Sequence, residues 1–109
     1  MEAKPRDVRI FQSVAGDAPF SSWLARLPDG KARARIRVRI DRLALGNFGD
    51  CRSVGAGVFE LRIDWGLGYR VYFAVEGPSI VLLLCGGDKS TQSQDIAEAK
   101  SYWEDYKAR

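Results

Sequence analysis

The sequence contains no histidine, and this absence removes several kinds of chemistry at once. A Ser-His-Asp triad and a Cys-His pair both need an imidazole to move the proton, so neither mechanism is available to this chain. Structural zinc sites use histidine or several cysteines, whereas Cys51 and Cys85 are the two cysteines here and show no metal-ligand spacing. We therefore expect reduced thiols, no metal site and no cofactor.

A long apolar run is also absent. The longest, Ile80 to Cys85, is far short of the roughly 20 residues that span a membrane, and it suits a buried strand. The first residues, MEAKPRDVRIFQ, contain no apolar signal-peptide region, so a cytoplasmic location away from the membrane is expected. With 109 residues, 46% hydrophobic and 28% charged, the chain is expected to form one globular domain over 1–109.

Charge is unevenly distributed along the chain. The whole sequence carries a net charge of +3, but residues 1–49 hold ten Lys or Arg against five Asp or Glu, a balance of +5. Residues 50–109 hold seven against nine, a balance of −2. This asymmetry predicts a basic face for an anionic partner, either nucleic acid or an acidic protein. A solvated basic helix without a partner would give the same pattern.

The N-terminal half begins with a short strand over Val8–Gln12, followed by a predicted helix. The apolar stripe of this helix has the spacing i, i+3, i+4 and i+7 and consists of Phe20, Trp23, Leu24 and Leu27. Asp17 is its expected N-cap, and Pro19 lies in its first turn. A turn over Leu27-Pro28-Asp29-Gly30 then separates it from a second element.

That second element contains KARARIRVRI, residues 31–40, whose strict alternation fits a strand, although the alternation stops after Ile40. On a helix, one sector collects Ala32, Ile36, Ile40 and Leu43. The adjacent sector collects Lys31, Arg35, Arg39 and Arg42. Because arginine and alanine are strong helix formers and Gly46 provides a stop, we predict a helix over Lys31–Leu45 with its basic sector in solvent. A second apolar line, Ala34, Val38 and Leu45, is left for a partner or another element to cover.

The C-terminal half has the periodicity of a sheet. Val58–Asp64 and Tyr69–Glu76 alternate in polarity, and Ser79–Cys85 is apolar on both faces, as in a central strand. The short turns between them predict an antiparallel meander. A polar loop follows, with Thr91 and Gln94 as an expected capping box. A closing helix is predicted from the spacing of Ile96, Ala99, Trp103 and Tyr106. The fold class is therefore α+β, in the order β-α-α-β-β-β-α.

Polar residues on one face of the meander are the candidate site. Glu60, Arg62, Arg70 and Tyr72 project from neighbouring strands, and Lys89 follows the last strand. Arginines suit a phosphodiester, because they hold phosphate oxygens and stabilise the charge that builds on them. A carboxylate or a lysine of lowered pKa could take the proton from a ribose 2′-OH. An ordinary Glu–Arg cross-strand pair on a solvated face explains the same residues without any chemistry.

Two segments carry a family resemblance: GVFELRIDWGLGYRVYF and IVLLLCGGDKSTQSQDIAEA. Together they resemble the HigB/RelE-type toxins of bacterial toxin–antitoxin pairs, in the phage-related addiction module killer protein branch. The resemblance implies a RelE/ParE-like fold, in which an N-terminal helical hairpin and a C-terminal helix pack on a small antiparallel sheet. It also implies endoribonuclease activity on mRNA, usually on the ribosome, with inhibition of translation and cleavage by the neighbouring 2′-OH.

The resemblance also implies roles for individual residues. Arg70 matches an arginine that holds the scissile phosphate, and Arg62 and Lys89 match basic positions of the site. Glu60 stands where some relatives have lysine, and it is the expected proton-transfer residue. Asp95 stands where some relatives have a catalytic tyrosine. Further RNA contacts are expected from Arg35, Arg39, Arg42 and Tyr72.

The implied partners are mRNA, the ribosome and a cognate antitoxin, of a helix-turn-helix, HigA-like type. Two other functions fit the same resemblance. One is a ParE-like toxin that acts on DNA gyrase, and the other is a non-catalytic RNA-binding module. The cationic character of the candidate site favours RNA over gyrase.

Overall fold

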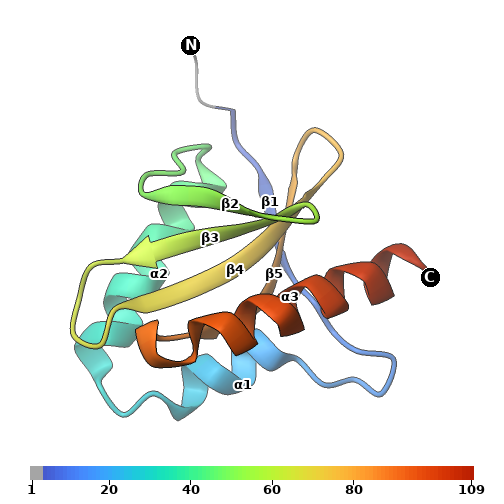
Figure 1. The fold of residues 1–109 in the computed structure, drawn as a ribbon. Coiled ribbons are helices and arrows are strands. Elements are labelled where there is room, and N and C mark those ends of the chain that lie inside the picture. The colour runs from blue at the N-terminus through green and yellow to red at the C-terminus, as the bar shows by residue number, and fades with distance from the viewer. Residues whose placement is uncertain (1–3) are drawn as a thin grey trace.

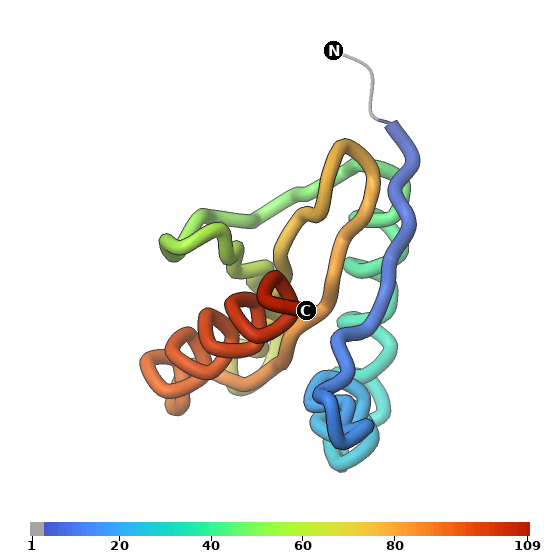
Figure 2. Tube along the Cα trace, turned by 90° about the vertical axis from the view of Figure 1, so that its right-hand side faces the viewer, coloured from blue at the N-terminus to red at the C-terminus, as the bar shows by residue number. Residues whose placement is uncertain are grey.

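The computed structural model describes residues 4–109, which form three layers (Figures 1 and 2). A five-stranded sheet lies in the middle. Helices α1 (Pro19–Arg26) and α2 (Gly30–Ala44) cover one face, and α3 (Gln92–Lys107) crosses the other. A short 3-10 helix, η1 (Lys89–Thr91), leads into α3. The α+β class predicted from the sequence is confirmed.

The sheet differs from the predicted one in two respects. Its strands are β1 (Asp7–Ile10), β2 (Cys51–Gly55), β3 (Val58–Ile63), β4 (Tyr69–Glu76) and β5 (Ile80–Gly87). The spatial order is β1-β5-β4-β3-β2, and the antiparallel meander of β3, β4 and β5 is confirmed. However, β2 is an additional strand, antiparallel to β3, and β1 pairs with β5 in parallel. The sheet is therefore mixed, and the order of helices and strands is β-α-α-β-β-β-β-α.

Each face of the sheet has its own apolar core. The core under α1 and α2 includes Phe20, Ile36, Leu43, Leu61, Val71 and Phe73. The core under α3 includes Val58, Tyr72, Leu82, Leu84, Ala99 and Trp103. In the part of the chain that the structure describes, no helix is long and apolar enough to cross a membrane. Both cysteines are free, and burial raises the pKa of each thiol.

The stretch at 31–40 is helical, as predicted. Asp29 caps α2, because its Oδ1 accepts hydrogen bonds from the backbone N–H groups of Lys31 and Ala32. The predicted apolar sector faces the core, and the second apolar line of Ala34, Val38 and Leu45 is exposed. Arg39 departs from the prediction: it is half-buried, because its guanidinium donates to the backbone carbonyls of Arg62, Phe48 and Asp50.

Two predicted helix caps are wrong. Asp17 does not cap α1; its backbone N–H bonds the hydroxyl of Ser13 in the preceding turn, and Ala18 occupies the N-cap without a side-chain bond. Thr91 and Gln94 do not form a capping box either. The box lies one turn earlier, between Asp88 and Thr91 at the start of η1. For Thr91 the reason is that its hydroxyl bonds the backbone of Asp88 and is thereby used at the start of η1.

The glycine pair at the end of β5 brings helices from both layers against the strand. A Cβ added to Gly86 would overlap the ring of Trp23 on α1. A Cβ added to Gly87 would overlap the carboxylate of Asp95 on α3. Glycine at these two positions therefore allows the close contact that places the N-terminus of α3 at the end of β5.

We predict that Gly86→Ala destabilises the protein by about 1–3 kcal/mol, because the added methyl must displace a packed indole ring. The free energy of unfolding in urea measures the effect. Gly30→Ala is the matched control, since Gly30 is the first residue of α2 and nothing lies closer than 3.4 Å to its added Cβ. That control should be neutral or slightly more stable than the natural protein. Equal stability of both variants would contradict the packing described here.

Candidate functional site

The candidate site lies on the face of the sheet that α3 crosses. Glu60 on β3 is directly opposite Arg52 on β2 and Tyr72 on β4. One step along the sheet, Arg62 on β3 is opposite Arg70 on β4. Because alternate residues of a strand share a face, these five side chains belong to one surface. The predicted grouping of Glu60, Arg62, Arg70 and Tyr72 therefore agrees with the strand register.

Glu60 is the centre of this group, and its side chain is fully buried. Its Oε1 accepts hydrogen bonds from the Nε atoms of Arg62 and Arg52, at 2.9 and 3.0 Å. Its Oε2 accepts from the Gln92 amide on α3 and from the Tyr72 hydroxyl, at 2.9 and 3.1 Å. The Nε of Arg70 lies 3.6 Å from the same Oε2. One carboxylate therefore joins β2, β3, β4 and α3.

These contacts determine the protonation state of Glu60. Burial alone would raise its pKa, but the hydrogen bonds from Arg62, Gln92, Arg52 and Tyr72 lower the pKa to about 2. The expectation of a solvated face is therefore wrong for Glu60, because the surrounding arginines, Tyr72 and Gln92 of α3 enclose its side chain. A carboxylate whose two oxygens already accept four hydrogen bonds is poorly suited to the proton transfer predicted for it. Its geometry suits the positioning of arginines.

Arg62, Arg70 and Lys89 line one pocket of about 400 Å³, which we call the cation pocket. It lies where β3 ends and β4 begins, beside the turn Gly66-Leu67-Gly68. The carboxylates of Asp50 and Asp64 also line it, so three cations face two acids. The sequence prediction that these three basic residues share a surface agrees with this arrangement.

Arg70 is the most constrained of the three. Its side chain is 9% exposed, and its Nη1 donates to the carbonyl of Gly68 at 2.6 Å. Its Nε is buried and has no hydrogen-bond partner among the described residues. A buried donor without a partner is costly, by about 1–3 kcal/mol, and a catalytic or binding role is one explanation for keeping it. The turn carbonyl and Glu60 together fix the direction of this guanidinium.

Two residues singled out in the sequence do not reach the cation pocket. Tyr72 is fully buried and its hydroxyl bonds Glu60, so it is not available to contact RNA. Burial and the neighbouring Glu60 charge raise the pKa of its phenol. Asp95 lies at the start of α3, where it accepts a hydrogen bond from Thr91. Burial raises the pKa of the Asp95 carboxyl, and the Thr91 hydrogen bond partly opposes that effect.

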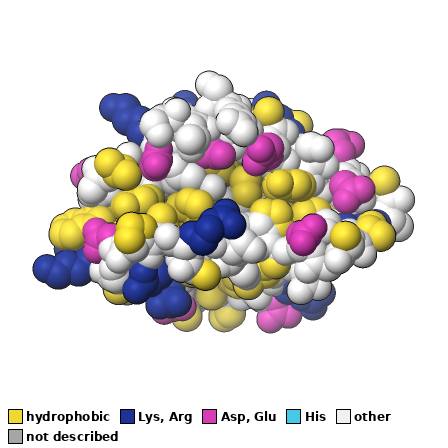
Figure 3. Space-filling view, turned by 90° about the horizontal axis from the view of Figure 1, so that it is seen from below, with side chains coloured by type: hydrophobic (Ala, Val, Ile, Leu, Met, Phe, Trp, Pro, Cys, Tyr) yellow, Lys and Arg dark blue, Asp and Glu magenta, His cyan; other side chains and the backbone are white. Residues whose placement is uncertain are grey.

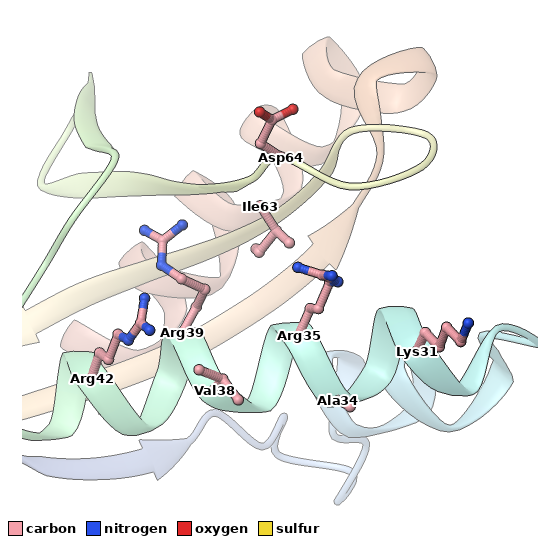
Figure 4. A pocket seen from close by; sticks show the side chains of 8 residues that line it. All are labelled: Lys31, Ala34, Arg35, Val38, Arg39, Arg42, Ile63 and Asp64. Carbon is pink, nitrogen blue, oxygen red and sulfur yellow. The ribbon is translucent and has the colours of Figure 1, made fainter.

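A second hollow lies beside α2, and we call it the α2 groove (Figure 4). It has a volume of about 500 Å³, and its lining residues are Lys31, Ala34, Arg35, Val38, Arg39, Arg42, Ile63 and Asp64. Ile63 and Asp64 also line the cation pocket, so the two hollows adjoin. Arg35 stacks on the Trp65 ring, with its Cζ 3.9 Å from the ring centroid. Whether Arg35, Arg39 and Arg42 contact RNA stays a prediction.

The third hollow has the opposite charge. It has a volume of about 540 Å³ between α1, the end of β5 and α3, and it is lined by one arginine, Arg26, and by the carboxylates of Asp17, Asp88, Asp95 and Glu98. The view from below shows several acidic side chains beside a hydrophobic band (Figure 3). A polyanion is repelled from such a surface. Among the described residues, the cation pocket therefore attracts a phosphate, whereas the acidic hollow repels it.

Sequence reasoning missed two members of the Glu60 group, Arg52 and Gln92. Arg52 lies on β2, where no strand was predicted, and Gln92 was assigned to a polar loop. A half-buried strand is recognised in a sequence by alternating apolar and polar residues. The β2 sequence, CRSVG, has a single large apolar residue, Val54, so it does not show this alternation. No signal within the sequence pairs Arg52 with Glu60, because that contact depends on the register of β2 against β3.

We predict that Glu60→Gln lowers stability in a pH-dependent manner. The pKa of Glu60 is lowered from its usual 4.5 to about 2, so the charged form stabilises the fold above pH 4.5, and this contribution is lost as the pH falls toward 2. The natural protein should exceed the variant by at most about 3 kcal/mol at neutral pH. This difference should shrink between pH 4.5 and 2. Urea unfolding of both proteins across this range measures it.

Glu104→Gln is the matched control, because Glu104 is an exposed residue of α3 whose one ion pair within residues 4–109 is with the neighbouring Lys107. Its unfolding free energy should stay within about 0.5 kcal/mol of the natural protein over the whole pH range. A constant difference between the natural protein and Glu60→Gln down to pH 2 would contradict the ionised, arginine-bound state of Glu60.

Comparison of the sequence with known proteins assigns the chain to a family. Residues 22–104 match the family described as "Phage derived protein Gp49-like (DUF891)". The chain is also 58% identical, over 81 residues, to an uncharacterized protein of Haemophilus influenzae; the match covers 74% of this chain and 82% of that relative. The matched residues include α2, the sheet from β2 to β5 and most of α3. The chain therefore belongs to the phage-derived Gp49-like family, which is associated with toxin–antitoxin addiction modules.

Proposed function

We propose that this protein is the toxin of an addiction module and that it cleaves mRNA as an endoribonuclease of HigB/RelE type, with a RelE/ParE-like fold. The family association supports the toxin role. The observation that carries the nuclease proposal is the cation pocket, in which Arg62, Arg70 and Lys89 meet beside the buried Glu60. The substrate is mRNA, held on the ribosome in the cytoplasm, and its cleavage inhibits translation and growth.

The proposed reaction is a transfer within the RNA strand. The ribose 2′-oxygen attacks the adjacent phosphorus, an O2′–P bond forms, and the P–O5′ bond breaks. The products are a 2′,3′-cyclic phosphate and a 5′-hydroxyl, so the proton lost from O2′ balances the proton gained by O5′. Negative charge increases on the phosphoryl oxygens in the transition state. Arginine is suited to this charge, because it stays protonated at cellular pH and its planar fork matches two phosphate oxygens.

The residues of the pocket take distinct roles in this proposal. Arg70 holds the scissile phosphate, and Arg62 and Lys89 stabilise the developing charge. Glu60 positions Arg62 and Arg70 and does not itself move the proton, because its oxygens are occupied by hydrogen bonds. Asp50 and Asp64 are the exposed carboxylates of the pocket and are available to accept a proton. Metal ions have no part in this proposal.

We predict that Arg70→Ala lowers the rate of mRNA cleavage by about 10²–10³-fold and abolishes growth inhibition on induction, because one donor to the transition state is lost. Mapping of mRNA 5′ ends after regulated expression measures the cleavage. Since Arg70 is largely buried, thermal unfolding must show that the variant is folded. Arg70→Lys keeps a charge without the fork, and it should recover cleavage only in part.

Arg37→Ala is the matched control, since Arg37 is an exposed arginine of α2 that lines neither the cation pocket nor the α2 groove. It should cleave like the natural protein. Folded Arg70→Ala protein that cuts mRNA at the natural rate would remove Arg70 from the mechanism. If induction causes DNA damage and filamentation with intact mRNA, the ParE-like function on gyrase is correct and the nuclease proposal fails.

The partner in this proposal is a cognate antitoxin, a helix-turn-helix protein of HigA-like type encoded in the adjacent reading frame. We place its docking segment in the α2 groove. The groove combines apolar side chains of Ala34, Val38 and Ile63 with a surrounding set of cations, and Val38 is 47% exposed. An acidic amphipathic helix complements both features, because its apolar face covers Val38 while its carboxylates meet Lys31 and Arg42.

We predict that Val38→Lys weakens this complex at least tenfold, because it adds a charge to the apolar part of the groove. Co-purification of the toxin with the tagged neighbouring gene product measures the effect, as does rescue of growth. Val14→Lys is the matched control; Val14 is 85% exposed and lies in a loop outside the groove. Normal co-purification of Val38→Lys would show that the docking site lies elsewhere. If the natural toxin forms no complex with the neighbouring gene product, the proposed partner itself is wrong.

A further inference from the structure

Arg52 on β2 is a charged residue of the Glu60 group for which the proposed chemistry has no role. It does not line the cation pocket, and its side chain is 53% exposed. We propose that Arg52 binds the RNA phosphate next to the scissile one, so that the substrate strand continues from the cation pocket across Arg62 to β2. This inference rests on the proposed nuclease function and extends its binding site.

The first support is that Arg52 and Arg62 are held side by side. Both Nε atoms lie within 3.0 Å of the same oxygen, Oε1 of Glu60. Nε is the atom bound to Glu60 in each case; one terminal nitrogen shares that edge of the guanidinium, and the remaining terminal N–H groups point along its other edges. Among residues 4–109, these terminal groups of Arg52 and Arg62 have no hydrogen-bond partner. Two neighbouring guanidinium groups therefore present unused donors to solvent.

The second support is the charge balance around Glu60. One carboxylate is shared by Arg52, Arg62 and Arg70, so it compensates one of three positive charges. A single arginine is enough to form an ion pair with Glu60, so two of the three guanidinium groups are not needed to neutralise it. Asp50 and Asp64 balance part of the charge of Arg62 and Arg70 inside the cation pocket, but Arg52 lies outside that pocket. An anionic ligand with more than one charge, reaching both the pocket and Arg52, accounts for the additional guanidinium group. A strand with successive phosphates has this property, whereas a single phosphate would occupy the cation pocket alone.

The third support is the position of Arg62 and Arg52, which we call the strip, relative to α3. Gln92 on α3 bonds Glu60, and Lys100, two turns later on α3, lies over the β2–β3 hairpin, where its Nζ would be 3.4 Å from a Cβ at Gly55. Arg52 therefore lies between the cation pocket and a further lysine. Arginine and lysine side chains that follow a backbone form the electrostatic path typical of single-strand binding. The ligand class is single-stranded RNA bound through its phosphates.

The test measures binding without cleavage. A single-stranded RNA with 2′-O-methyl groups cannot be cut through its 2′-oxygens, so its affinity can be followed by fluorescence anisotropy over a range of salt concentrations. For single strands, each phosphate contact contributes about 0.7 to the slope of log affinity against log salt. Arg52→Ala should reduce the slope by about 0.7 and weaken binding several-fold. Arg52→Lys keeps a point charge and should keep most of the slope.

Arg37→Ala is again the matched control, because it removes the same charge from an exposed position of α2 without altering the strip. It should keep the natural slope. In cleavage assays Arg52→Ala should raise KM about tenfold with kcat within about threefold, since Arg52 holds a phosphate that does not react. A merely structural role in supporting Glu60 would instead lower kcat and leave the salt slope unchanged.

A second measurement does not depend on whether Arg52→Ala folds. Neutral methylphosphonate groups can replace the phosphates of the RNA one at a time, with the natural protein as the binding partner. Neutralising the phosphate that flanks the scissile one should weaken binding several-fold. If only the scissile position is sensitive, or if Arg52→Ala keeps the full slope, the inference is wrong while the nuclease proposal stands. If the natural protein neither binds nor cleaves RNA, the proposed function fails and this inference fails with it.

Discussion

The buried carboxylate of Glu60 is the interaction on which the arrangement of the site depends. A carboxylate removed from water is unstable unless hydrogen bonds replace its hydration. Glu60 obtains these bonds from three different strands and from α3, through Arg52, Arg62, Tyr72 and Gln92. Each donor must be in place for the group to be tolerated. The register of β2 against β3 and the position of α3 are therefore linked to the same two oxygens.

This constraint explains why the face of the sheet under α3 is divided into an apolar and a polar part. In the apolar part, Leu82 and Leu84 of β5 pack with Ala99 and Trp103 of α3. The polar part begins where Gln92 reaches Glu60, near the first turn of α3. The arginines that surround Glu60 extend beyond the helix toward solvent, with increasing exposure from Arg70 through Arg62 to Arg52. The cation pocket is thus the open border of a packed polar group.

The sequence predicted the elements whose signals are local. Helix α2 was correct because its apolar residues recur at helical spacing over fifteen positions, and the β3–β4–β5 meander was correct because short turns separate alternating strands. The parallel pairing of β1 and the existence of β2 were missed, since pairing between distant segments leaves no periodic trace. The grouping of Arg62, Arg70 and Lys89 was predictable, whereas the burial of Glu60 and Tyr72 was not, because it depends on where α3 lies.

The choice of arginine at three positions around one carboxylate follows from the shape of its side chain. The guanidinium has donors on two sides, so Arg52 and Arg62 can bond Glu60 through Nε and still direct their terminal amino groups outward. Lysine carries all its donors on one nitrogen, and a lysine that bonded Glu60 would have its charge largely directed at that carboxylate. A glutamate at the centre of this group is consistent with this logic. Its negative charge lowers the net positive charge of the site by one. In return, its contacts fix the direction of Arg52, Arg62 and Arg70. The entropy of holding these side chains is lost on folding and is therefore not lost again when an anion binds to them.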